Sequence, residues 1–187
     1  MERKADNITL AIGEKAPYFS LPATDGKIYS LSDFVGAPAL CVIFTCNHCP
    51  YSQAYERRLC ELAAAYQPRG IGFVAICAND ADGYPEDGFE KMVERSKLAG
   101  FPFPYLRDEE QNVARAYDAA CTPEVYLFNH ELRLAYHGWI DDNHEDAGKV
   151  TRHDLRDALD AVLAGEEPPT QLTPVLGCSI KWKTQRW

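Results

Sequence analysis

An unbroken apolar run, Ala39 to Phe44, is followed after one residue by the motif Cys46-Asn47-His48-Cys49-Pro50. Apolar runs of this length are typical of strands that are buried on both faces of a sheet. Apolar residues then recur at helical spacing as far as Tyr66. Because proline is tolerated in the first turn of a helix but not deeper, the helix is predicted to begin within a few residues before Pro50, at about Cys46. Two cysteines are therefore expected where a buried strand passes into a helix N-terminus.

The segments on either side of this unit predict an α/β fold. Before it, residues 19–31 have the alternation of a β-hairpin with a turn at Asp25-Gly26, and residues 32–34 suggest one helical turn. After it, the apolar run 71–77 predicts a second buried strand, and residues 89–96 predict a helix that Gly100 ends. We therefore expect parallel central strands with helices on both faces of the sheet.

The second half of the chain continues the same alternation. Asp108 and Gln111 resemble a capping box that starts a helix ending near residue 117. A strand over 125–128 and a partner over 132–136 read as a second hairpin. The last helix is expected to have Thr151 as its N-cap, an apolar stripe over 155–162, and Gly165 just past its end.

The length of 187 residues suits one domain. Pro168, Pro169 and Pro174 cannot continue the last helix, so we divide the chain into a folded domain over 1–165 and an extended tail over 166–187. The tail carries Cys178, Trp182 and Trp187, and we expect it to pack on the same domain.

Charge and hydropathy exclude several classes of protein. Asp and Glu outnumber Lys and Arg by 28 to 19, a net charge of −9, which disfavours nucleic acid and anionic membranes as partners. No run of eighteen apolar residues is present, and the first ten residues lack the apolar stretch of a signal peptide. A cytoplasmic protein is expected, in a compartment where thiols stay reduced unless they are catalytic. The sequence leaves open whether it is a monomer or a homodimer.

The Cys-x-x-Cys spacing at a helix start is the strongest chemical signal. A free thiol has a pKa of about 8.5, and the unpaired N–H groups and dipole of a helix start favour the thiolate. We predict that Cys46 is the outer, attacking thiol with a lowered pKa and that Cys49 is the resolving thiol. A cationic His48 would stabilise the Cys46 thiolate further.

The other cysteines do not form a second recognisable site. The chain has seven cysteines at irregular spacings, which argues against a structural disulfide framework. A structural zinc site needs four ligands, and no second Cys-x-x-Cys or paired histidines are present. We therefore expect no metal and no other cofactor.

Several motifs resemble those of a known family. The order of elements is similar to the thioredoxin fold, and four motifs look like a peroxiredoxin-like, AhpC/TSA-type redoxin group of thioredoxin-family proteins. These motifs are Gly13-x-x-Ala16-Pro17-x-Phe19, Phe44 to Tyr51, Cys121-Thr122-Pro123-Glu124 and Gly177 to Lys183. The resemblance implies that Pro123 is cis and packs beside the cysteine pair, and that the Thr122 backbone hydrogen-bonds an extended substrate.

The chain departs from peroxiredoxins at one informative place. Their peroxidatic cysteine lies in a Pro-x-x-x-Thr-x-x-Cys motif that aligns with Cys49. Here Cys46 stands where the threonine is expected and Val42 where the proline is expected. Because those residues help to bind peroxide, the resemblance to the fold does not by itself imply peroxidase activity.

Cys121 and Cys178 are candidate additional redox residues. Cys121 precedes Pro123 by two residues, so it is expected near the pair. Cys178 lies on a tail that is long enough to fold back. We hypothesise that Cys178 exchanges with Cys46 or Cys121, with simple burial as the alternative.

The leading functional hypothesis is thiol–disulfide exchange on a protein or small disulfide, with a dithiol reductant as the recycling partner. A thiol peroxidase that uses Cys49 or Cys46 is the second hypothesis. The third is Cu(I) handling, because Cys46, Cys49 and His48 offer soft ligands.

Overall fold

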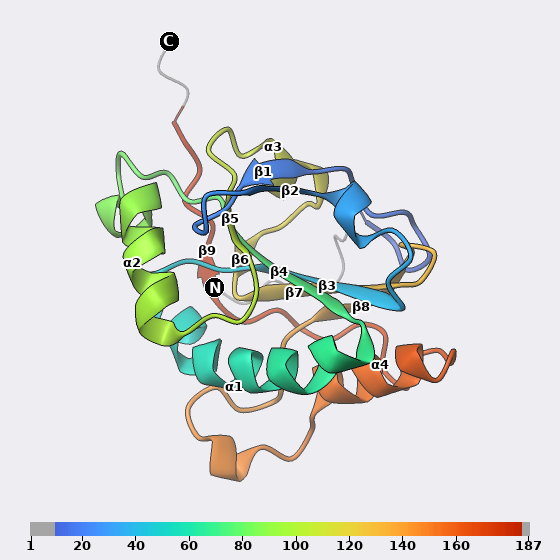
Figure 1. Ribbon diagram of the computed structural model, residues 1–187. Helices are drawn as coiled ribbons and strands as arrows, with labels where there is room; N and C mark the ends of the chain where they lie inside the picture. The colour runs from blue at the N-terminus through green and yellow to red at the C-terminus, as the bar shows by residue number, and fades with distance from the viewer. Residues whose placement is uncertain (1–9, 185–187) are drawn as a thin grey trace.

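The computed structural model describes residues 10–184. Its centre is a mixed five-stranded sheet in the order β5-β4-β3-β7-β8 (Figure 1). The strands are β3 (Ala39–Phe44), β4 (Gly72–Cys77), β5 (Tyr105–Arg107), β7 (Glu124–Asn129) and β8 (Leu134–Gly138). Strands β3, β4 and β5 run parallel, whereas β7 pairs antiparallel with β3 and β8 pairs antiparallel with β7.

Both faces of the sheet are covered, as the unbroken apolar strands predict. The helices are α1 (Pro50–Tyr66), α2 (Phe89–Ala99), α3 (Asn112–Ala116) and α4 (Asp154–Leu163). Helices α1 and α4 lie on one face, and α3 lies on the other with the antiparallel hairpin of β1 (Ser20–Pro22) and β2 (Ile28–Ser30) (Figure 1). Alternate residues of β3 point to opposite faces of the sheet. Cys41 and Ile43 pack in the core between the sheet and helices α1 and α4. Leu40 and Val42 pack in the core on the opposite face, which α3 and the hairpin cover.

Three details of the predicted elements are corrected. Helix α1 begins at Pro50, with Cys49 as its N-cap residue, because the motif before the proline is held in a non-helical loop. Helix α3 has Gln111 at its N-cap in a left-handed conformation, so no capping box forms, and Asp108 instead accepts a 2.8 Å hydrogen bond from the Ala114 amide. Helix α4 starts after His153, because the side chain of Asp142 binds the amide and the hydroxyl of Thr151.

The C-terminal segment returns to the centre of the molecule. Strand β9 (Cys178–Ser179) pairs antiparallel with β6 (Cys121–Thr122), which precedes β7, and the two lie side by side in Figure 1. Further along, the Lys181 carbonyl accepts hydrogen bonds from the Asp80 amide at 2.8 Å and from the Gln111 side chain at 2.8 Å. Trp187 lies outside the described residues. Within residues 10–184, no helix is long and apolar enough to cross a bilayer.

Candidate active site

Cys46 and Cys49 lie in the loop that joins the carboxyl end of β3 to the start of α1. Both are reduced, and both are buried, with 2% and 0% of their surface exposed. The two thiols lie close enough for each to shift the pKa of the other. The predicted strand-to-helix placement is therefore confirmed, and the two sulfurs are close enough to interact directly.

Thr122 contacts both cysteines from the opposite side of the site. Its hydroxyl is 3.3 Å from Cys46 Sγ, and its carbonyl oxygen is 3.1 Å from Cys49 Sγ. The Thr122–Pro123 peptide bond is cis, as the resemblance implies. Residues far apart in the sequence, at the ends of β3 and β6, thus meet around the two sulfurs.

The two thiols influence each other's ionisation. The proximity of Cys46 lowers the pKa of Cys49, whereas the proximity of Cys49, burial and the charge of Asp87 raise the pKa of Cys46. The contacts with Thr122 act in the other direction, because its hydroxyl can donate to a Cys46 thiolate and lowers the pKa of Cys46, while its carbonyl can only accept the proton of Cys49. Which of the two sulfurs holds the negative charge in the dithiol therefore stays a prediction.

Asp87 is a site residue that the sequence analysis missed. It is fully buried just before α2, and each of its carboxylate oxygens has two partners. Oδ1 accepts from the Asn47 amide at 2.7 Å and from the His48 amide at 3.3 Å. Oδ2 accepts from the Asn79 side chain at 2.8 Å and lies 2.5 Å from His48 Nδ1. Asp87 thus holds the loop between the two cysteines in place.

His48 faces Asp87 more closely than it faces the sulfur. Its Nδ1 is 4.0 Å from Cys46 Sγ, against 2.5 Å from Asp87 Oδ2. The ring also stacks on Tyr84, with the ring centroids 5.0 Å apart. His48 thus contacts both Asp87 and Cys46, and the expected stabilisation of a Cys46 thiolate by His48 stays a prediction.

Cys178 lies close to Cys46 and Cys49, whereas Cys121 lies next to Thr122 on the opposite face of its strand. Cys178 is opposite Thr122 in the β6–β9 pairing, and Cys49 is close enough to add to the effect of burial, which raises the pKa of Cys178. Because neighbouring strand residues point to opposite faces, Cys121 points away from the side on which Thr122 reaches Cys46. The predicted position of Cys178 near the pair is confirmed, with Cys49 as its neighbour, and a redox role for Cys121 stays a prediction.

A second buried polar group supports the strand that carries Thr122. The carboxylate of Glu124 accepts from the amides of Ala120 and Cys121 at 2.7 and 3.0 Å, and its Oε1 lies 2.7 Å from Nε2 of the buried His137. Burial alone would raise the pKa of Glu124, but the hydrogen bond and charge of His137 outweigh it, and the pKa is lowered. The backbone on the amino side of Pro123 is thus anchored by a charged, hydrogen-bonded group.

Donor atoms of Cys46, His48 and Asp87 lie within 4.8 Å of one another, which is the spacing of a metal site. The carboxylate oxygens are already occupied by the four hydrogen bonds of Asp87. A carboxylate is also a hard ligand that does not suit Cu(I). The cluster is explained as the support of the cysteine loop, and it does not favour the Cu(I) hypothesis.

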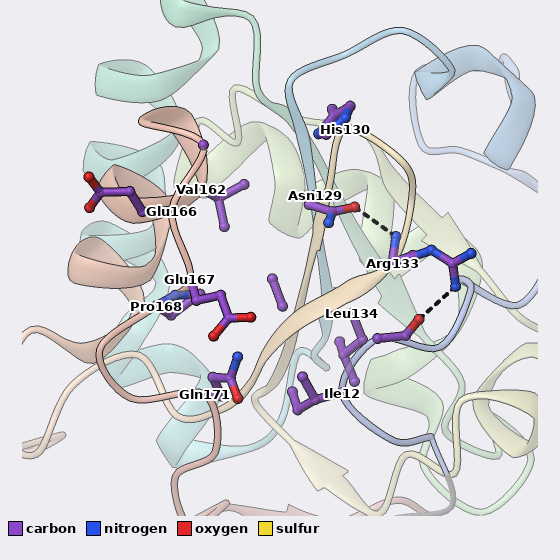
Figure 2. A pocket seen from close by; sticks show the side chains of 13 residues that line it. Ile12, Asn129, His130, Arg133, Leu134, Val162, Glu166, Glu167, Pro168 and Gln171 are labelled. Atoms are coloured by element: carbon purple, nitrogen blue, oxygen red, sulfur yellow. Dashed lines mark hydrogen bonds between the residues drawn. The ribbon is translucent and has the colours of Figure 1, made fainter.

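A pocket of about 220 Å³ lies elsewhere, between the β7–β8 turn and the segment that follows α4 (Figure 2). Figure 2 shows His130 and Arg133 on the side of the turn and Glu166 and Glu167 on the opposite side. None of its thirteen lining residues is a cysteine. The pocket is therefore separate from the sulfur site.

Comparisons with known proteins agree with this geometry. An uncharacterized conserved protein of known structure from Geobacillus kaustophilus is 44% identical, with 95% of each chain covered and a TM-score of 0.90. The thiol-disulfide oxidoreductase ResA of Geobacillus thermodenitrificans is 25% identical over 159 residues, which are 84% of this chain and 81% of ResA. A protein assigned as a thioredoxin from Neisseria meningitidis, at 22% identity, covers 81% of this chain and 91% of its own with a TM-score of 0.64, which confirms the thioredoxin fold. The model of the AhpC/TSA family matches residues 12–137, so the chain belongs to the AhpC/TSA family.

Proposed function

We propose that this protein is a thiol–disulfide oxidoreductase in which Cys46 and Cys49 cycle between a dithiol and a disulfide. The observation that carries the proposal is the pair of buried thiols at a helix start, both in contact with Thr122. The similarity to ResA supports the same class of reaction. The substrate is a protein or small disulfide, and a dithiol reductant returns the pair to the reduced state.

The contacts of Thr122 suggest the order of events. A thiolate is the attacking species in disulfide exchange. We assign the first attack to Cys46, because the hydroxyl of Thr122, 3.3 Å from Cys46 Sγ, can donate to its thiolate. We assign the resolving step to Cys49, which donates its proton to the Thr122 carbonyl in the reduced protein.

The backbone of Thr122, where an extended substrate was expected to bind, is already paired with another strand of the same chain. Strand β9 occupies the antiparallel position beside Cys121–Thr122. An extended peptide could hydrogen-bond the Thr122 backbone only by displacing β9. Substrate binding at this edge therefore remains a proposal that requires movement of the tail.

Turnover with insulin as the disulfide substrate and dithiothreitol as the reductant tests the proposal. We expect the protein to accelerate insulin reduction well above the rate of dithiothreitol alone. A protein that accelerates neither insulin reduction nor the reduction of a small aromatic disulfide would contradict it.

A thiol peroxidase is the second candidate, and the lowered pKa of Cys49 favours it specifically. This cysteine occupies the position of the peroxidatic residue in peroxiredoxins, which also need a thiolate. Peroxide consumption coupled to dithiothreitol measures this activity. A rate with hydrogen peroxide that exceeds the rate with insulin would make the peroxidase the main function.

A further inference from the structure

Strand β9 covers the backbone edge that lies beside the two cysteines. Thr122, whose hydroxyl and carbonyl oxygen reach Cys46 and Cys49, is paired through its backbone with Cys178 in an antiparallel register. Only 2% of the surface of Thr122 is exposed, and Cys46 and Cys49 are equally buried. A disulfide on an extended polypeptide therefore meets an edge that a strand of the same chain already occupies.

The residues on either side of Cys178 hold β9 in this register. A Cβ atom on Gly177 would lie 2.1 Å from the Thr122 carbonyl oxygen, so only glycine allows the two backbones to approach this closely. Beyond β9, the Ile180 amide donates to the Ala120 carbonyl at 2.9 Å. The Ile180 side chain is buried in the core on the face of the sheet that α3 covers. The sequence of the segment thus fits it to the Thr122 edge.

The next anchor of the segment is shared with the cysteine loop. The Asn79 side chain accepts from the Lys181 amide at 2.9 Å and donates to the Asp87 carboxylate at 2.8 Å. Asp87 in turn accepts from the amide of Asn47, which lies between the two cysteines, at 2.7 Å. Movement of β9 and the support of the cysteine loop are therefore linked through Asn79.

We propose that residues 177–180 are an internal pseudosubstrate strand, which occupies the binding edge of an extended polypeptide disulfide and must leave it before such a substrate binds. The inference rests on the proposed function. A peptide that adds a strand to a sheet edge gains main-chain hydrogen bonds, and at Thr122 β9 already holds that position. A binding-competent state that is rarely populated weakens the apparent affinity in proportion to its population. Strand β9 therefore disfavours polypeptide substrates, whereas a small disulfide needs no main-chain bonds at Thr122.

Gly177→Ala tests the proposal in the full chain, because the added Cβ atom cannot fit while β9 is paired. The measurement is the rate at which the reduced pair becomes a Cys46–Cys49 disulfide, followed by acid quenching and mass mapping. With insulin as the oxidant, we expect the rate constant to rise about fivefold or more. With bis(2-hydroxyethyl) disulfide, it should change by less than about twofold, because this substrate does not need the edge.

Gly165→Ala is the control variant. A Cβ atom at this position meets no atom within 4 Å, but its φ of +75° strains alanine, so stability is lost away from the edge. Both rate constants should stay at their wild-type values. Should Gly177→Ala fold poorly, Ile180→Ala loosens β9 from the other side, and Leu134→Ala in the same core is its control.

Peptide binding gives a second readout that does not depend on redox activity. A synthetic peptide of residues 174–183 with Cys178→Ser should bind Gly177→Ala about tenfold more tightly than the wild-type chain, and Gly165→Ala no more tightly than the wild-type chain. Equal peptide binding by the three chains would overturn the inference, as would an equal rise of the two rate constants in Gly177→Ala or no rise with insulin. Failure of the wild-type pair to be oxidised by either disulfide would contradict the proposed function, and peptide binding would still decide whether β9 covers a polypeptide-binding edge.

Discussion

Cys46→Ser should lower the rate of dithiol-driven disulfide reduction about a thousandfold or more, to the level of the reductant alone, because the attacking thiol is removed. Cys49→Ser should keep the attacking thiol but lose the thiol that releases the substrate, so it should accumulate a mixed disulfide on Cys46. The ultraviolet absorbance of the thiolate, followed against pH, measures the ionisation of the remaining sulfur in each variant.

Cys60→Ser is the matched control, because Cys60 lies on the same helix but only half-buried and outside the sulfur site. It should leave the turnover and the thiolate signal unchanged. Full activity of Cys46→Ser, or a mixed disulfide trapped on Cys49 instead of Cys46, would show that the assigned order of attack is wrong.

Asp87→Ala should reduce the free energy of unfolding by about 3–5 kcal/mol, which is the usual cost of removing one partner from a buried charged network. The substitution leaves the amides of Asn47 and His48 and the side chain of Asn79 without their acceptor. Unpaired buried donors are costly, and the loop between the cysteines loses its support. Chemical denaturation of the reduced protein measures the change.

The neighbouring residue Glu86 offers a matched control for Asp87. Its side chain is exposed, and its contact with the loop is made by its backbone carbonyl, which accepts from the Asn47 side chain at 2.7 Å. Glu86→Ala should therefore change the unfolding free energy by about 0.5 kcal/mol or less. An equal loss of stability in the two variants would show that Asp87 has no special role in holding the loop.

The parts of the fold that sequence patterns predict are those with a strong local signal. The unbroken apolar runs predicted β3 and β4, and Gly100 ends α2 in a left-handed conformation, as expected. Strand β5 was missed because it is only three residues long and follows a proline-rich stretch. The N-terminus of α4 was misplaced because Thr151 is hydrogen-bonded to Asp142 in the preceding loop instead of capping the helix.

In the candidate site too, the residues with a local motif could be predicted and the others could not. Local motifs mark Cys46, Cys49 and the residues before Pro123, so the placement of these residues was predictable. Asp87 comes from a segment about forty residues away and carries no motif, so only the fold shows that it holds the loop. The ionisation of each sulfur cannot be predicted from the motif, because it depends on the Thr122 hydroxyl and carbonyl, which reach the pair from a strand far along the chain.

The most direct test of the redox pair is an equilibrium titration of the protein in buffers of defined thiol–disulfide potential, with mass mapping of the cysteines at each point. Stabilisation of the reduced form by a thiolate makes a disulfide more oxidising. We therefore predict a single two-electron transition between the dithiol and a Cys46–Cys49 disulfide, at a potential more positive than about −270 mV, the value of thioredoxin. Failure of these two sulfurs to bond at any potential would contradict the proposed function.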